Sequence, residues 1–116
     1  MKYFTVEEAN KMLPLVRKIV EDILLTGESI REFVGINPHD IENNPDFQIM
    51  NRILFDYIDE LSDLGCHYKD WNFKTGLVDF PAIINDREVL LCWKSDESEI
   101  KYYHDIEAGF SGRMRL

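Results

Sequence analysis

Positive charge is scarce in this sequence. Thirteen lysine and arginine residues stand against 22 aspartate and glutamate residues, and the formal net charge at pH 7 is −9. A chain with this charge repels a phosphate backbone, so we expect no nucleic-acid partner. The C-terminal GRMRL is the one dense basic stretch, and its two arginines are too few to reverse the charge of the molecule.

Long apolar runs and cysteines are scarce as well. No run of about 18 apolar residues occurs, so we expect no membrane-spanning helix. The charged N-terminal stretch MKYFTVEEANK lacks the pattern of a signal peptide. The two cysteines, Cys66 and Cys92, suit a reducing cytoplasm, where they need not pair. A disulfide between them is geometrically possible but not expected, and we predict a cytoplasmic protein.

The length and the hydrophobic content of the sequence suffice for one folded domain. The chain has 116 residues, 45% of them hydrophobic, which allows one core but not two. We predict a single domain over residues 1–116. Its segments are a helix over 5–34, a helix over 46–64, a β-meander over 66–105 and a C-terminal tail over 106–116.

A heptad pattern of apolar residues runs through the first helix. Its members lie three or four residues apart, which is the spacing by which one helix packs along another. Thr5 suits the N-cap, and Glu8 three residues on completes a capping box. Pro14 removes one backbone donor, so we expect a kink there, with a break into two helices as the alternative. The members are Val6, Ala9, Leu13, Val16, Val20, Ile23, Ile30 and Val34, with Gly27 in the one slot without an apolar side chain.

A second apolar pattern follows the turn-rich segment from Gly35 to Pro45. Asp46 suits the N-cap of this second helix, and Gly65 stands where a helix usually ends. Two such helices joined by a loop of about ten residues fold back into an antiparallel, coiled-coil-like pair. The members of this pattern are Phe47, Met50, Leu54, Tyr57, Leu61 and Leu64.

Several large apolar residues lie off both patterns, and a two-helix hairpin cannot bury them by itself. Either the C-terminal half of the chain or a second copy of the chain must cover them. We expect some of each, and therefore predict a homodimer that forms through the helices. These residues are Met12, Leu15, Ile19, Leu24, Leu25, Ile49, Ile53 and Ile58.

The second half of the chain changes to short runs of β-forming residues separated by turn residues. Runs joined by such short turns pair antiparallel. We therefore predict an α+β fold. In it, a long antiparallel two-helix hairpin packs with an antiparallel β-meander of three to four strands.

The turns predict a register for this meander. A two-residue turn at residues 85–86 places Asp79 opposite Cys92. A next turn centred on residues 96–97 places His104 on the packed face of the sheet, away from Asp79. A slip of one residue would exchange the faces, so this register is a hypothesis.

Three segments of the sequence resemble one protein family. They are YFTVEEANKMLPLV near the start, TGLVDFPA in the middle, and LCW with E.EI.YYH and AGFSGR towards the end. They resemble short bacterial proteins known as the domain-of-unknown-function family 2203. The resemblance covers nearly the whole chain, with residues 35–44 the least similar. Because that family is itself uncharacterised, the resemblance implies recurrent positions but no activity.

The recurrent positions that the resemblance implies lie in the last third of the chain. This sequence departs from the family pattern at Asp96, Ser98 and Tyr103, where glycine, proline and tryptophan are usual. Those changes alter turn geometry and one aromatic surface but leave the polar positions intact. The positions are Asp79, Phe80, Pro81, Cys92, Trp93, Glu97, His104, Gly109, Phe110, Gly112 and Arg113.

Some of these polar residues are candidates for chemistry. Asp79 or Glu97 together with His104 would form a general acid–base pair. The alternative is structural: Asp79 and Glu97 anchor Arg113 or backbone donors, and so tie the tail to the sheet. Aromatic strand residues more often fill a core than line a pocket. The candidate ligand-binding residues are Trp93, Tyr103 and Arg113.

Asp79 and His104 are also candidate metal ligands. A zinc site needs three or four converging ligands, and the sequence has neither two histidines four residues apart nor a zinc-finger cysteine pair. A histidine hydrogen-bonded to a carboxylate is the favoured interpretation, and we predict no cofactor. Cys92 is not expected to be a nucleophile, because Asp79 beside it would raise the pKa of its thiol.

Two functions follow from these residues. The first is a non-enzymatic self-associating or protein-interaction module, and it requires the polar residues to be paired internally and an apolar helix surface to be free. The alternative is a small enzyme or ligand- or metal-binding module, and it requires an open cleft shared by one set of residues. That set is Asp79, Glu97, His104 and Arg113. The sequence leaves open whether the protein is an enzyme and which small molecule it would bind.

Overall fold

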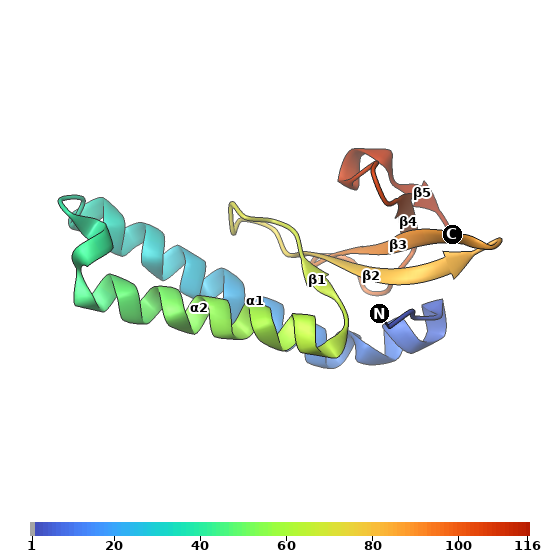
Figure 1. The fold of residues 1–116 in the computed structure, drawn as a ribbon, viewed down its shortest axis with the longest axis horizontal. Coiled ribbons are helices and arrows are strands. Elements are labelled where there is room, and N and C mark those ends of the chain that lie inside the picture. Colours follow the sequence, from blue (N-terminus) through green and yellow to red (C-terminus); the bar gives the residue numbers. More distant parts are fainter. Residues whose placement is uncertain (1) are drawn as a thin grey trace.

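The computed structural model describes residues 2–116 and has an α+β fold, as predicted. A long antiparallel pair of helices lies against one end of an antiparallel sheet, and the far half of the pair projects beyond it (Figure 1). The molecule is accordingly elongated, with extents of 51 × 25 × 24 Å. The elements in order are α1 (Val6–Ile36), η1 (Ile41–Asn43), α2 (Pro45–Leu64), β1 (His67–Tyr68), β2 (Leu77–Ile84), β3 (Arg87–Lys94), β4 (Tyr102–Asp105), η2 (Phe110–Gly112) and β5 (Met114–Arg115).

The first helix, α1, begins where the sequence predicts. The Thr5 hydroxyl accepts a hydrogen bond from the Glu8 amide at 3.0 Å, and the Glu8 carboxylate accepts one from the Thr5 amide at 3.0 Å. This reciprocal capping box confirms the predicted start. The helix continues through Pro14 to Ile36, so the alternative of two separate helices is wrong.

The second helix, α2, begins slightly earlier than predicted. Its N-cap is Asn44 and not Asp46, because the Asn44 side chain accepts hydrogen bonds from the amides of Asp46 and Phe47 at 2.9 and 3.3 Å. Pro45 suits the first helical position, where no amide hydrogen is needed. Gly65 ends the helix as predicted, with a φ of 97° that favours glycine.

The heptad patterns identify most of the helical core. The buried residues of the two patterns are Ala9, Leu13, Val16, Val20, Ile23, Gly27, Leu54 and Leu61. Ile19 and Ile58 were expected outside the patterns but are buried as well, because a packed helix buries a stripe wider than a single heptad line. At the projecting end, Ile30 and Val34 are only half-buried, since no sheet packs over this part of the hairpin (Figure 1).

The sheet has five strands in the order β1-β2-β3-β4-β5, one more than the upper limit predicted. The outermost strands, β1 and β5, are short edges of two residues each. The central β2–β3 register is the predicted one, with Asp79 opposite Cys92. Asn85 and Asp86 form the connecting turn with φ values of 51° and 62°. The sheet approaches α1 closely at Gly76, where an added Cβ would lie 2.3 Å from Val20 Cγ1.

The predicted β3–β4 register is wrong by one residue. His104 pairs with Leu90, which places it on the same face as Asp79. The connection is longer than a two-residue turn, because Ile100 leaves the strand and packs into the core, 3% exposed. Its amide donates to the Asn10 side chain of α1 at 2.8 Å. This shift of one residue exchanges the faces of β4.

No helix within residues 2–116 is both long enough and apolar enough to cross a bilayer.

Candidate functional site

The corrected register brings three polar side chains together on one face of the sheet, beside Gly109 and Phe110. His104 Nε2 lies 3.2 Å from Asp79 Oδ1, and both residues are almost fully buried, at 2% and 4% exposure. Cys92 of β3 lies beside this pair and is also buried. The predicted Asp79–His104 acid–base pair is therefore in contact, through a register that the sequence did not predict.

His104 is held in a defined orientation. Its Nδ1 lies 2.8 Å from the main-chain oxygen of Asp105. A carbonyl oxygen can only accept, so Nδ1 carries the hydrogen of this bond and Nε2 faces Asp79.

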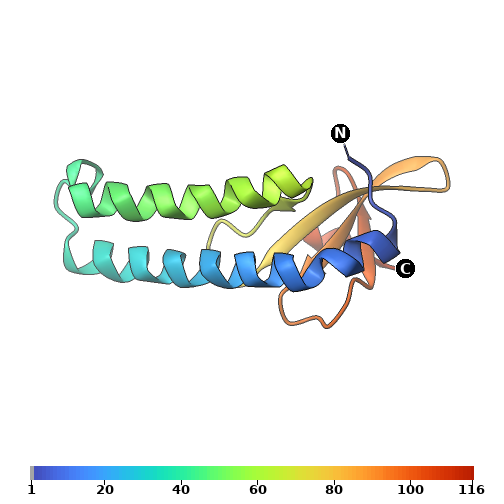
Figure 2. The same cartoon turned by 90° about the horizontal axis from the view of Figure 1, so that it is seen from below.

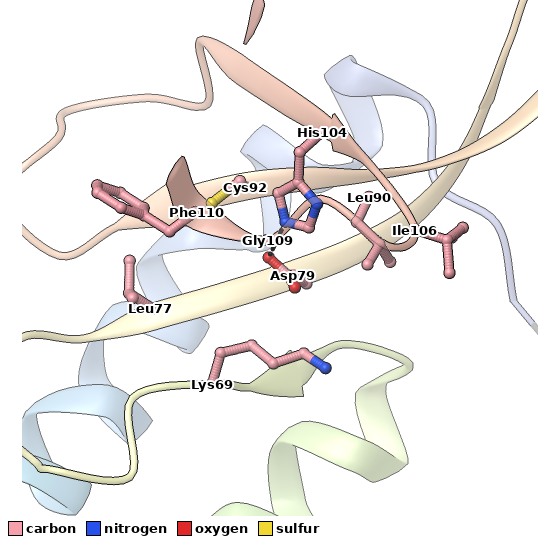
Figure 3. A pocket seen from close by; sticks show the side chains of 9 residues that line it. All are labelled: Lys69, Leu77, Asp79, Leu90, Cys92, His104, Ile106, Gly109 and Phe110. Carbon is pink, nitrogen blue, oxygen red and sulfur yellow. Dashed lines mark hydrogen bonds and ion pairs between the residues drawn. The ribbon is translucent and has the colours of Figure 1, made fainter. Parts of the chain in front are cut away.

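A cavity of about 280 Å³ opens beside this pair. Figure 3 shows the side chains of Asp79, Cys92 and His104 lying close together, with Lys69 across the cavity. The lining is otherwise mostly apolar and consists of Leu77, Leu90, Ile106, Gly109 and Phe110. A small ligand entering it would reach the three buried polar groups.

Glu97 and Arg113 form a second and separate pair. One guanidinium nitrogen of Arg113 lies 2.6 and 2.8 Å from the two carboxylate oxygens of Glu97 and 3.1 Å from the main-chain oxygen of Cys92. The Lys94 amide also donates to Glu97, at 2.8 Å. The guanidinium lies 4.1 Å from the ring centre of Tyr102. Glu97 therefore anchors Arg113 and the tail to the sheet, as the structural alternative expected.

The two aromatic ligand candidates lie on the opposite face of the sheet. Trp93 is fully buried in the core, where its indole N–H donates to the main-chain oxygen of Glu97 at 2.9 Å. The guanidinium of Arg17 lies 5.1 Å from the ring centre of Trp93. Tyr103 pairs with Leu91 and packs half-buried against the core. Neither side chain lines the cavity.

Cys92 and Lys69 line this site but are not among the predicted site residues. The predicted register correctly places Cys92 beside Asp79. It places His104 on the other face, and so it does not predict that the three side chains lie together. The signal that could have joined them was Ile100, an isolated apolar residue among polar ones just before β4. If Ile100 must reach the core, the turn lengthens and His104 moves to the face of Asp79.

Both thiols are expected to be unreactive in the folded protein. Burial is the largest effect that raises the pKa of Cys66 to about 12 and the pKa of Cys92 to about 12, and at Cys92 the charge of Asp79 adds to it. A raised folded-state pKa stabilises the fold below the unfolded pKa of about 9, and this stabilisation is lost as the pH rises towards 12. We expect no reaction with a disulfide reagent at pH 8 in native buffer, and two reactive thiols per chain in urea. Rapid labelling of native protein would contradict the burial of both residues.

These features define a class of small α+β protein, in which a helical hairpin packs on one face of a five-stranded antiparallel sheet and a buried histidine–aspartate pair lies on the other face. A model of the family described as uncharacterized conserved protein (DUF2203) matches residues 2–116, and the chain belongs to this family. No curated protein and no solved structure matches the chain.

Proposed function

We propose that the protein is a non-enzymatic self-associating module that forms a homodimer through its α1–α2 hairpin. The observation that carries this proposal is a set of exposed aliphatic side chains on the two helices. Leu25 of α1 is 63% exposed, and Ile49 and Ile53 of α2 are 56% and 43% exposed. Surface of this kind, when contiguous, favours association because its burial is worth about 25 cal/mol per Å².

The exposed residues of α2 form a stripe. Ile49, Ile53 and the half-buried Tyr57 are spaced four residues apart and therefore lie along one side of the helix. Figure 2 views the hairpin from the side away from the sheet, and within residues 2–116 no strand covers the two helices in this view. This geometry leaves room for a second hairpin to dock lengthwise.

Charge favours one arrangement of the two copies. α2 carries five acidic residues and one basic residue, Arg52, whereas α1 carries six acidic and four basic residues. Two α2 helices facing each other would repel. A two-fold dimer that sets α2 of one protomer against α1 of its partner in a four-helix arrangement would repel less, because α1 is less acidic than α2.

Internal pairing of the polar residues supports this proposal over the alternative of a small enzyme that uses four residues as one set. That alternative needs Asp79, Glu97, His104 and Arg113 in one open cleft. The four side chains instead form two pairs, and each pair is largely buried.

We expect the purified protein to have twice its chain mass of 13.7 kDa in sedimentation or light scattering at micromolar concentration. The double variant Ile49→Lys/Ile53→Lys should be monomeric, because two charges would be buried in the apolar stripe. The matched control is Ile83→Lys, an isoleucine that is 49% exposed but lies on β2 of the sheet, and it should remain dimeric. A monomeric wild type, or a dimer that the double variant leaves intact, would rule out association through this stripe.

A further inference from the structure

Three side chains with metal-ligating atoms converge on one face of the sheet. Asp79 of β2, Cys92 of β3 and His104 of β4 present oxygen, sulfur and nitrogen atoms that all lie within 4.8 Å of one another. Asp79 stands directly opposite Cys92, and His104 is diagonal to Cys92 on the next strand. We propose that these three residues bind one divalent metal ion with the ligand preference of zinc.

The orientation of His104 is the first argument. Its Nδ1 donates to the main-chain oxygen of Asp105, so a neutral ring has its lone pair on Nε2, 3.2 Å from Asp79 Oδ1. A lone pair and a carboxylate oxygen repel at this distance unless a positive charge, either a proton or a metal ion, lies between them. A hydrogen bond from the second ring nitrogen to a carbonyl oxygen is also how proteins orient metal-bound histidines.

The donor set is the second argument. Thiolate, imidazole and carboxylate together suit zinc, whereas calcium and magnesium prefer oxygen ligands alone. Tetrahedral zinc with ordinary bond lengths holds its donor atoms roughly 3.3–3.6 Å apart. The Asp79–His104 separation of 3.2 Å is already close to that range. Because no pair among the three donors exceeds 4.8 Å, a side-chain shift of roughly 1 Å would complete the set.

Charge balance is the third argument. A divalent ion bound by one thiolate, one carboxylate and one neutral imidazole has no net charge. A neutral site has the smallest desolvation cost when it is buried. Burial raises the pKa of the Cys92 thiol, and a bound dication opposes that effect because it stabilises the thiolate directly.

The cavity completes the geometry. Three protein ligands leave the fourth position of a tetrahedral ion open, as in zinc sites that bind water or a ligand. All three residues line the cavity of about 280 Å³, so this fourth position faces space for a small ligand. Lys69 lies across the cavity in Figure 3 and would favour an anionic ligand there.

The test uses Co²⁺ as a spectroscopic probe on the full-length protein after treatment with a chelator. We expect one equivalent of Co²⁺ per chain, a thiolate-to-cobalt charge-transfer band, and loss of this band when Zn²⁺ is added. The variant Cys92→Ala should lose the band and bind Co²⁺ at least ~100-fold more weakly. Loss of a residue that only hydrogen-bonds a metal ligand already costs up to about 100-fold in affinity, and Cys92 is itself a ligand. His104→Ala should bind Co²⁺ as weakly as Cys92→Ala.

Matched controls exist for both ligands. Cys66 is also a fully buried thiol, but its Sγ lies 3.5 Å from the main-chain oxygen of Leu61, so Cys66→Ala should keep the band. His39 is an exposed histidine in the loop between α1 and α2, so His39→Ala should keep full affinity. The wild-type spectrum tests whether a thiolate binds Co²⁺ even where a variant fails to fold.

Three results would each overturn the proposal. The first is that folded wild-type protein fails to bind one equivalent of Co²⁺. The second is binding without a thiolate-to-cobalt band, and the third is a band that persists in Cys92→Ala. The first would mean that a proton, and not a metal ion, lies between His104 and Asp79. The oligomeric state is measured separately, so failure here leaves the proposed dimer unaffected.

Discussion

Replacing Trp93 by alanine should lower the free energy of unfolding by about 3–5 kcal/mol, a large part of the roughly 5–15 kcal/mol that holds a domain of this size together. Trp93 is fully buried, and its indole N–H satisfies the main-chain oxygen of Glu97 at 2.9 Å. Arg17 lies over the ring and donates to the main-chain oxygens of Ser95 and Glu97. The substitution therefore removes the ring that packs the β3–β4 connection against α1.

Urea unfolding followed by far-UV circular dichroism measures this loss. The matched control is Trp71→Ala, because Trp71 is 55% exposed and contacts the rings of Phe55, Tyr68 and Phe73 only from the surface. That control should cost about 0.5–1.5 kcal/mol. Equal losses for the two variants would contradict the central position of Trp93 in the core.

Replacing Arg113 by alanine should cost about 3–5 kcal/mol, because it leaves the Glu97 carboxylate largely buried without its cationic partner. The two side chains are only 13% and 16% exposed, so solvent screens their interaction weakly. The substitution also removes the contacts of the guanidinium with the rings of Tyr102 and Phe110. Arg113→Lys should recover only part of the loss, since an ammonium cannot stack on both rings and reach the carboxylate.

The control for this second effect is Arg115→Ala. Arg115 is exposed on β5 and lies 5.5 Å from the Tyr102 ring centre, so its loss should cost no more than about 0.5–1 kcal/mol. Hydrogen exchange should show faster exchange of the Leu116 amide, which bonds to the main-chain oxygen of Lys101, in Arg113→Ala. A double variant Glu97→Gln/Arg113→Met as unstable as the sum of its single variants would show that the two residues do not interact.

Local patterns accounted for the helices and the central hairpin. The capping box at Thr5, the glycine at Gly65 and the turn at 85–86 act over a few residues, and the structure has all three. The predicted N-cap of α2, Asp46, is wrong because Pro45 suits the first helical position, which makes Asn44 the cap. The short edge strands β1 and β5 have too few residues for any periodicity.

The candidate site depended on contacts that span the chain. The turn before β4 was predicted from its local residues, but Ile100 is drawn to the core and bonded to Asn10, 90 positions away in the sequence. That single displacement decides which face His104 occupies, because strand side chains alternate.

The sequence by itself determined the α+β class, the two helices and the Asp79–Cys92 pairing, because these follow from periodicity and short turns. Only the tertiary structure decided that His104 joins Asp79 and Cys92, that Glu97 pairs with Arg113, and that the far half of the hairpin stays uncovered. The physical reason is that a side chain's face and partner are set by the register of whole strands, and that register is set by contacts between distant elements.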